Sequence, residues 1–561
     1  MASVITPVLR QADTNPEHVA LRSAQSCWTY AQLRDAALAY AEALRKQGIG
    51  PGGRVLLIAP TVPEFVIAYL GIQALGGVVV PVNTMSTRPE LEYFIGDAGC
   101  SLVVAWHELG PAAAEAAAMH GVPHWSLTEG ARVAGDEILS VVCDRAPDDA
   151  AVILFTSGTT GRPKGAELTV GNLLSAGEIS ARLNGTNPED RVGTGLPLFH
   201  VFGQAAVLMS ALTGGATVSL LSRFSGEAML DVLRRDRLTI MCGVPTMWNA
   251  MLHSAGDAST ADFAQLRLAV SGGASLPAEI ARAFQEKFGC TLLEGYGLTE
   301  TTAIATFSGA TAPAGTVGGA VFDTEVQIRD LAGQPVGPNT AGEVYIKGPT
   351  VMRGYHNRPE ATADVLSVDG WLRTGDIGEM DAEGNLRIVD RAKDLIIRGG
   401  HNIDPGAIED IMFQHPAVGL AAVVGQPDAY AGELPVGYVQ LKPGATVTPG
   451  ELESWVREHA PERAAIPVQI IQVDLMPLTG VGKIFKPQLR WDAARRVFSS
   501  VLDPLAKTGV DCEVQVGPHD SHGSIATVTI TRVPEHKREV IANEVDTLLA
   551  PFVMRRRIVF A

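Results

Sequence analysis

The chain has little of several features that mark common protein classes. Basic residues are outnumbered, with 44 Lys and Arg against 61 Asp and Glu, and the formal net charge is −17. Because a negative surface repels polyanions, this balance disfavours nucleic acid and anionic membranes as partners. The apolar stretch over residues 64–82 is interrupted by Gly and Pro, so it predicts a helix, a turn and a strand rather than a membrane span.

Cysteine is also sparse, and the cysteines show no pairing pattern. No two of them form a CxxC pair, which disfavours a cysteine metal site or a disulfide framework and favours small buried side chains in a reducing compartment. The six are Cys27, Cys100, Cys143, Cys242, Cys290 and Cys512. The N-terminal segment MASVITPVLRQADTNPEH lacks the charged start and apolar core of a signal peptide. We expect a cytoplasmic protein without integral membrane association.

What the chain does have is length and a regular alternation of segments. Its 561 residues, 46% of them apolar, are too many for one hydrophobic core and predict two or more domains. Short β-branched runs alternate with amphipathic helical stretches over the first four hundred residues or so, which predicts an α/β region of mostly parallel, helix-covered sheets. The expected elements are strands at 54–60, 101–106, 150–157, 216–221, 238–245, 266–273 and 291–297, and a helix at 63–76.

The character of the sequence changes near residue 390, where the charged stretch VDRAKDLIIRGG suggests a hinge. We expect a large N-terminal domain over 1–390 and a small α+β domain over 391–495. The remaining segment, 496–561, has a strand–helix–strand pattern and is expected to be an added module of unknown role.

The strongest local signal is TSGTTGRPKG at residues 156–165, directly after an expected strand. Its glycines allow close backbone approach, and its N–H and hydroxyl groups form a site for an anion. Lys164 adds a positive charge suited to phosphate oxygens. The segment is not a P-loop of the GxxxxGK[ST] type, because Gly165 follows the lysine. A polar turn is the alternative, but this ordered combination after a buried strand favours a phosphate loop.

TSGTTGRPKG resembles the signature of the adenylate-forming (AMP-binding) superfamily, which includes acyl-CoA synthetases, peptide-synthetase adenylation domains and beetle luciferases. Further blocks of that family follow in order, among them LPLFHVFG, LAVSGGASLP, LLEGYGLTETT, WLRTGD and PLTGVGKIFKP. The resemblance implies the acyl-CoA synthetase (fatty-acid:CoA ligase) branch. A ligase of this branch uses ATP to form an acyl-adenylate and pyrophosphate, and then forms acyl-CoA and AMP. The fold implied is a large adenylation domain with a small mobile lid.

The resemblance also implies which residues bind ATP and AMP. Glycines at strand ends would let the adenine base lie against backbone, an aromatic ring would stack on it, and a carboxylate would accept both ribose hydroxyls. The residues implied are Thr156, Ser157, Gly158, Thr159, Thr160, Lys164, Gly272, Gly273, Ala274, Glu294, Gly295, Tyr296, Asp376 and Arg391.

The implied catalytic residues are Lys483, Thr299, Glu300 and His200, and Thr159 and Glu300 would hold Mg²⁺, a hard cation that prefers oxygen. The implied acyl pocket contains Phe199, His200, Phe202, Gly203 and Ala303. A lone His among apolar residues is by itself typical of a core histidine. Amino-acid-activating relatives usually carry an Asp near this position, so its absence favours a plain carboxylic acid, fatty or otherwise apolar.

The implied hinge residue is Lys393, and the implied coenzyme A loop contains Arg398, Gly399 and Gly400. His401 stands where relatives often have Glu, which leaves open how this loop meets CoA. Two rival hypotheses remain: transfer of the acyl group to a carrier protein or another acceptor, and a non-catalytic sensor that kept the fold. The expected partners are a small carboxylic acid, ATP and CoA, with the protein a monomer or homodimer.

Overall fold

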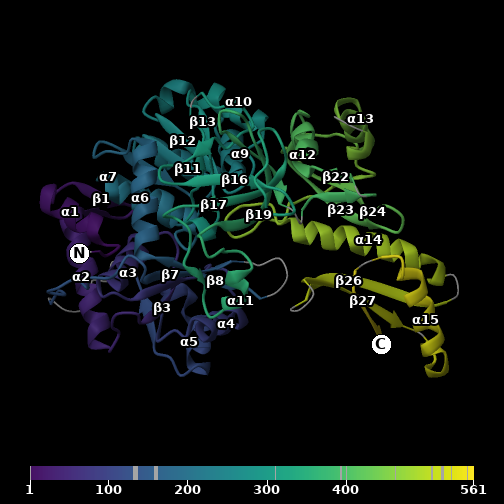
Figure 1. Ribbon diagram of the computed structural model, residues 1–561, viewed down its shortest axis with the longest axis horizontal. Helices are drawn as coiled ribbons and strands as arrows, with labels where there is room; N and C mark the ends of the chain where they lie inside the picture. The colour runs from purple at the N-terminus through teal and green to yellow at the C-terminus, as the bar shows by residue number, and fades with distance from the viewer. Residues whose placement is uncertain are drawn as a thin grey trace. The chain divides into compact units, whose positions relative to one another are not determined.

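The computed structural model describes most of the chain, and its contacts divide it into two compact units. The described residues are 2–129, 137–156, 162–309, 311–391, 394–399, 401–460, 463–506, 509–519, 523–531, 533–552 and 554–561, without the side chains of 390, 391, 402 and 523. The first unit comprises Met1–Thr156, Lys164–Thr374 and Gly378–Ile388, and the second Ser157–Pro163, Gly375–Ile377 and Val389–Ala561. Each is described by itself below (Figure 1).

The first unit contains a seven-stranded sheet in the order β18-β8-β7-β4-β3-β5-β6. Its five parallel strands are β7 (Ala150–Thr156), β4 (Val78–Pro81), β3 (Arg54–Ile58), β5 (Leu102–Trp106) and β6 (His124–Leu127). At one edge β8 (Lys164–Thr169) and β18 (Gly354–Tyr355) run antiparallel to their neighbours. The short edge pair carries Lys164, so the sheet edge positions part of the expected phosphate loop.

A second, nine-stranded sheet has the order β15-β14-β13-β12-β11-β9-β10-β1-β2. Its centre is parallel and its edges antiparallel. The strands are β15 (Gly319–Ala320), β14 (Thr306–Phe307), β13 (Leu292–Tyr296), β12 (Leu268–Gly272), β11 (Ile240–Gly243), β9 (Arg191–Thr194), β10 (Thr217–Leu220), β1 (Val19–Arg22) and β2 (Cys27–Thr29). A smaller four-stranded sheet contains β16 (Glu325–Arg329), β17 (Gly342–Lys347), β19 (Leu372–Met380) and β20 (Leu386–Arg391), with β16 and β17 antiparallel.

Helices fill the space between the two large sheets and cover the outer face of at least one of them. Apolar residues of α2 (Tyr30–Lys46), α3 (Pro63–Ala74), α6 (Val170–Asn184) and the π-helix η2 (Phe202–Met209) share one core with both sheets. In β3, Val55 and Leu57 face this core, whereas Leu56 and Ile58 face α4 (Arg88–Ala98) and α5 (Gly110–Met119). This alternation is what a strand buried on both faces requires. The other helices are α1 (Thr6–Thr14), α7 (Ser210–Gly214), α8 (Gly226–Arg235), α9 (Pro245–Ser254), α10 (Ala278–Phe288) and α11 (Pro359–Ala363).

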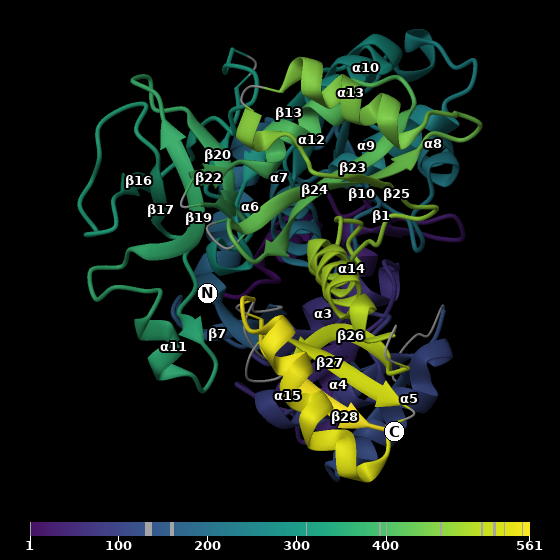
Figure 2. The same ribbon diagram turned by 90° about the vertical axis from the view of Figure 1, so that its right-hand side faces the viewer.

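The described residues of the second unit form three small hydrophobic cores, two of which share one helix. The first core is built from α12 (Pro405–Phe413), α13 (Pro449–His459) and a sheet of β21 (Ile396–Arg398), β22 (His401–Ile403), β23 (Val418–Asp428), β24 (Gly432–Leu441) and β25 (Ile470–Gln472). Helix α14 (Lys486–Ala506) packs Leu489 and Ala493 against β23 and β24. Its later residues, Phe498 and Leu502, belong to the core of the C-terminal segment. Figure 2 shows the end of α14 beside that segment.

The C-terminal segment is an ordered three-stranded sheet with a helix. Its elements are β26 (Asp511–His519), β27 (Gly523–Thr531), α15 (Arg538–Leu549) and β28 (Arg556–Phe560), with β27 in the middle. The expected strand–helix–strand pattern is present, and β26 precedes it as a further strand. The side chain of Trp491 in α14 donates a hydrogen bond to Ser524 Oγ at 2.9 Å, which fastens β27 to the shared helix.

The predicted α/β class, with a large helix-covered domain, a small C-terminal α+β domain and a C-terminal extension, is confirmed. Every expected element between residues 54 and 297 is present, with ends at most two residues from the expected bounds. In the described part of the chain no helix is long and apolar enough to cross a membrane. Of the six cysteines, Cys100, Cys242 and Cys290 are buried, and burial raises the pKa of the Cys290 thiol to about 11.

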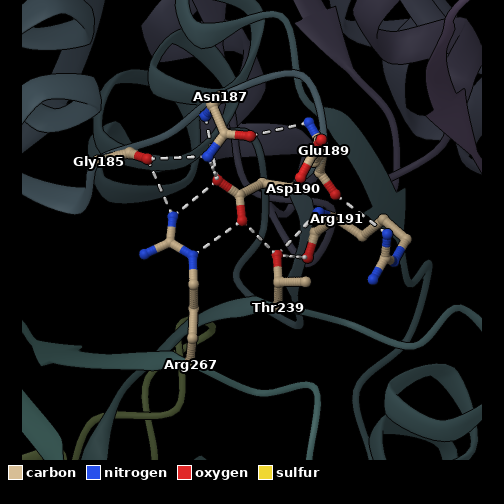
Figure 3. A network of polar contacts seen from close by, with 7 residues as sticks. All are labelled: Gly185, Asn187, Glu189, Asp190, Arg191, Thr239 and Arg267. Carbon is tan, nitrogen blue, oxygen red and sulfur yellow. Dashed lines mark hydrogen bonds and ion pairs between the residues drawn. The ribbon is translucent and has the colours of Figure 1, made fainter.

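A buried polar network joins the amino ends of neighbouring strands in the nine-stranded sheet (Figure 3). The carboxylate of Asp190, which is 3% exposed, accepts hydrogen bonds from Arg267 Nε at 3.0 Å and Nη2 at 2.7 Å, and from Thr239 Oγ1 at 2.7 Å. It also accepts one from the backbone N–H of Asn187 at 3.0 Å. Thr239 in turn accepts the N–H of Arg191 at 3.0 Å. The network therefore fixes the starts of β9, β11 and β12 relative to one another.

We expect Asp190→Asn to lower the free energy of unfolding by about 2 kcal/mol, because an amide cannot satisfy the Arg267 guanidinium as a carboxylate does. Urea denaturation at neutral pH measures the loss. Asp257→Asn, which changes an exposed carboxylate, is the matched control and should leave the unfolding midpoint unchanged. Equal midpoints for the two variants would show that the network contributes nothing.

The same network predicts a pH dependence. Burial alone would raise the pKa of Asp190, but the hydrogen bonds from Arg267, Thr239 and the backbone outweigh it and lower the pKa. A lowered native pKa adds stability that is complete above the unfolded-state value, about 3.9, and is lost as the pH falls through the native value. The stability difference between wild type and Asp190→Asn should therefore be constant above about pH 5 and shrink below about pH 4. A difference that grows on acidification would contradict this sign.

Candidate active site

Two glycines lie side by side where the parallel strands β12 and β13 end. Gly272 is paired with Gly295, and Gly273 follows with φ of +78°. A Cβ placed on Gly272 would lie 3.1 Å from the ring of Phe202 and 3.2 Å from the Gly295 carbonyl oxygen. The expected acyl-pocket phenylalanine and the expected adenine-contacting glycines are therefore neighbours. Ligands of open α/β sheets commonly bind at these carboxyl ends of strands.

The turn after β13 is strained. Thr302 and Ala303 have φ of +48° and +78°, a region that side-chain-bearing residues rarely adopt. The turn folds back so tightly that a Cβ on Gly297 would lie 2.3 Å from the Ala303 carbonyl oxygen. Thr302 Oγ1 donates to the Thr350 carbonyl at 2.7 Å and helps to hold the turn. Strain of this kind persists where function needs a particular geometry, and Thr299 and Glu300 occupy this turn as the short helix η4 (Thr299–Thr301).

Glu300, Tyr355 and Lys164 come together from three elements. The Tyr355 hydroxyl donates a hydrogen bond to Glu300 Oε1 at 2.8 Å. The ammonium of Lys164 lies 5.2 Å from the centre of the Tyr355 ring, over its face. Burial, followed by the nearby Glu300 carboxylate, raises the pKa of the Tyr355 phenol. The phenol is therefore protonated at any working pH and acts as a donor.

The opposite face of the same strand pair holds a buried ion cluster. Glu167 in β8, 9% exposed, binds Arg353 Nε at 2.7 Å and His356 Nδ1 at 2.5 Å. The backbone N–H groups of Arg353 and His356 donate to the carbonyls of Glu167 and Gly165 at 3.0 and 2.7 Å. These bonds fix β18 on β8 and so fix Tyr355 beside Lys164.

The segment before η2 is tightly packed. His200 Nδ1 accepts the N–H of Phe202 at 3.2 Å, which assigns that nitrogen as an acceptor and gives the ring a structural contact at the start of the helix. A Cβ on Gly203 would lie 2.5 Å from the Pro197 carbonyl oxygen. Gly203 therefore allows a close backbone approach that holds the loop carrying Phe199 and His200.

The remaining predicted residues lie on strands or turns outside this group. Thr156 ends β7 and donates to the Lys164 carbonyl at 3.4 Å, and Asp376 lies in β19 with 4% exposure. Glu294 and Tyr296 lie in β13, and Ala274 follows β12. The backbone of Arg391 ends β20. Ser157, Gly158, Thr159, Thr160, Lys393, Gly400 and the side chain of Arg391 lie outside the described residues.

In the second unit, the described residues of the predicted CoA loop, Arg398 and Gly399, lie at the end of β21, which pairs antiparallel with β22. Gly399 has φ of +60°, a conformation that favours glycine, and donates its N–H to the Ala431 carbonyl at 2.7 Å. Arg398 Nη1 donates to the Ala464 carbonyl at 2.7 Å. Lys483 lies on a turn closed by its own backbone, with its N–H bonded to Thr479 Oγ1 at 3.1 Å and its carbonyl to the Thr479 N–H at 2.7 Å.

Tyr355 and the Glu167 cluster were not predicted from the sequence. One signal was present: Glu167 stands between the apolar residues Ala166 and Leu168 of a buried strand, and a buried carboxylate needs partners that compensate its charge. Nothing in the spacing identifies Arg353 and His356 as those partners, because they lie nearly two hundred residues away.

Glu300 fits the chemistry of a magnesium ligand. In the part of the chain that the structure describes, no group of three or more His, Cys, Asp or Glu side chains could hold a metal. Mg²⁺ is commonly held by one or two carboxylates together with substrate phosphates rather than by a complete protein cage. The carboxylate of Glu300, which contacts the same tyrosine as the cationic Lys164, suits that arrangement, which is typical of an enzyme that handles a nucleoside triphosphate.

Comparison with known proteins agrees with this geometry. The AMP-binding enzyme model matches residues 8–356, and the model for the AMP-binding enzyme C-terminal domain matches residues 407–483. The chain belongs to the AMP-binding enzyme family. The resemblance to adenylate-forming enzymes of the acyl-CoA synthetase branch is thereby confirmed.

Named relatives and solved structures match over most of their length. A feruloyl-CoA synthase from an Amycolatopsis species is 34% identical over 86% of this chain and 97% of its own. A long-chain-fatty-acid–CoA ligase from Bacillus subtilis is 33% identical over 82% of this chain and 89% of its own. The crystal structure of ATP-bound MatB from Rhodopseudomonas palustris has a TM-score of 0.82 and 31% identity, over 87% of this chain and 98% of that one.

Gly203→Ala tests the packing of the His200 loop. The added methyl meets a backbone carbonyl that cannot move cheaply, so we expect a loss of about 1–3 kcal/mol of stability and a higher KM for the acid. Thermal unfolding and acid-dependent pyrophosphate exchange measure the two effects. Gly337→Ala, where a Cβ would meet nothing within 4 Å, is the matched control. Wild-type stability and KM in Gly203→Ala would show that the close approach is unimportant.

Proposed function

We propose that this protein activates an apolar carboxylic acid with ATP and transfers the acyl group to coenzyme A. The predicted enzyme class, an AMP-forming acid–CoA ligase, is confirmed by the family and by the curated relatives. ATP and CoA are accordingly its co-substrates. The identity of the acid, the role of Mg²⁺ and the roles of single residues are the proposed part.

The observation that carries the site assignment is the meeting of Lys164, Glu300 and Tyr355 next to the carboxyl ends of β12 and β13. The same tyrosine contacts a cation suited to phosphate oxygens, Lys164, through its ring and a carboxylate suited to a metal ion, Glu300, through its hydroxyl. The glycines of the strand ends carry no side chain, and the adenine base would lie against their backbone.

The first reaction joins two anions, so it needs positioned positive charge. A carboxylate oxygen of the acid attacks the α-phosphorus of ATP, the bond to the bridging oxygen breaks, and pyrophosphate leaves. Lys164 would bind phosphate oxygens, and Glu300 with Thr159 would hold Mg²⁺, which neutralises triphosphate charge when bound. In the second reaction the CoA sulfur attacks the acyl carbonyl, loses its proton, and AMP leaves with the bonding electron pair.

An apolar acid is the substrate class that the pocket residues support. Phe202 and Ala303 are apolar, and the His200 Nδ1 lone pair is already used by a backbone N–H. The segment LPLFHVFG carries no acidic residue that could pair a substrate amine. The two curated relatives act on ferulate and on long-chain fatty acids by their names, so aromatic and aliphatic acids are both to be tested.

The experiment is ATP–pyrophosphate exchange with a panel of fatty, aromatic and alicyclic acids, with and without CoA. We expect exchange with one class of apolar acid, and AMP with thioester only when CoA is added. Amino acids are the matched negative substrates. Exchange that CoA never converts into thioester would move the assignment to another acyl acceptor, and no exchange with any acid would overturn the proposal.

Lys483, assigned by resemblance to the adenylation step, gives a second test. We expect Lys483→Ala to lower the adenylation rate by about two to three orders of magnitude, the typical effect of losing one electrostatic donor. Thioester formation from supplied acyl-adenylate should be spared. Lys442→Ala, a lysine on a different loop, is the control and should retain both rates. Equal damage to both half-reactions in Lys483→Ala would contradict a role confined to adenylation.

A further inference from the structure

Tyr355 contacts two charged side chains, Lys164 and Glu300. The sequence motifs and the family resemblance assign these to ATP phosphate oxygens and to Mg²⁺. Its hydroxyl donates to Glu300 Oε1 at 2.8 Å, and its ring face carries the Lys164 ammonium at 5.2 Å from the centre. All three side chains are partly exposed, so a ligand can reach the group.

We propose that Tyr355 is a positioning residue that sets Glu300 for the metal-bound triphosphate through its hydroxyl and sets Lys164 through its ring. This inference rests on the proposed function and deepens it. The two effects of Tyr355 can be separated by mutation, because its hydroxyl acts on the Glu300 carboxylate and its ring on the Lys164 ammonium.

The backbone around Tyr355 holds it in place. Its N–H donates to Thr362 Oγ1 at 2.9 Å, and the pair Tyr355–Ala166 belongs to the β18–β8 ladder. The carbonyl of Glu300 accepts the N–H of Met352 at 2.8 Å, so the turn that carries the carboxylate is bonded to the segment that carries the tyrosine. A phenol held by these backbone bonds can orient the Glu300 carboxylate and the Lys164 ammonium.

The hydroxyl bond restricts the Glu300 carboxylate. A glutamate has three rotatable side-chain bonds and loses freedom when it binds a ligand. With Oε1 accepting the phenol proton, that freedom is already lost before the metal-bound triphosphate arrives, which is pre-organisation of a ligand group.

The ring acts differently. The face of a phenol attracts an ammonium ion, so the Tyr355 ring holds Lys164 near the site. A lysine held by an aromatic face keeps its full charge for phosphate oxygens.

The test is equilibrium binding of nucleotide by calorimetry, with neither acid nor CoA present. Tyr355→Phe removes the hydroxyl and keeps the ring, so we expect about tenfold weaker binding of MgATP, the size of effect of a lost hydrogen bond to a charged group. The Mg²⁺ concentration for half-maximal binding should rise, and metal-free ATP should bind as in wild type. Tyr355→Leu removes the ring as well and should also weaken metal-free ATP.

Tyr30→Phe is the matched control. It removes a buried hydroxyl that donates to the Ala216 carbonyl at 2.8 Å, so it loses a comparable hydrogen bond far from the candidate site. We expect lower thermal stability in this variant with unchanged affinity for MgATP and for Mg²⁺.

A double-mutant cycle separates positioning from a general structural role. If Tyr355 acts through Glu300, Glu300→Gln with Tyr355→Phe should bind MgATP no more weakly than Glu300→Gln alone. Additive losses, or wild-type MgATP affinity and Mg²⁺ dependence in Tyr355→Phe, would overturn the inference while leaving the ligase assignment intact. A wild-type protein that shows no exchange with any acid would instead overturn the proposed function itself.

Discussion

The pairing of two short edge strands, β8 and β18, is the constraint on which the candidate site depends. β18 has two residues, yet it brings Tyr355 beside Lys164 from a distant part of the sequence. Glu167 secures the pair from the other face by binding Arg353 and His356. Removing a charge from water costs several kcal/mol unless a partner compensates it, so this cluster disfavours any other register of the pair.

The two ends of the strands in the nine-stranded sheet differ in their residues and in their contacts. At the amino ends, the Asp190 network fixes how β9, β11 and β12 start relative to one another. At the carboxyl ends, Gly272 and Gly295 lie opposite each other with Phe202 against them. Hydrogen bonds thus stabilise one end, and the other is free to carry small residues and a strained turn.

The strands of the parallel core could be predicted from the sequence because local composition determines where each strand begins and ends. Buried strands such as Arg54–Ile58 are short β-branched runs between turn residues, and their bounds follow from composition. The turn with Glu300 was located by its motif, and the phosphate-binding role of residues 156–165 stays a prediction. The site's supporting residues were not predicted, because Tyr355 lies in a strand too short to show a period. The close approach of Gly203 to Pro197 also has no signature, since it depends on packing between segments. The roles of Asp376, Lys483 and the CoA loop stay predictions.

Helix α14 joins two of the small hydrophobic cores of the second unit. Its 21 residues extend over about 31 Å at the usual helical rise, and its two halves belong to different hydrophobic cores. Neither core can turn without carrying the other, because the shared helix and the Trp491–Ser524 bond connect them. The C-terminal sheet therefore follows the orientation of the small domain. A spectroscopic label on its exposed face would report any rotation of that domain at an enlarged radius.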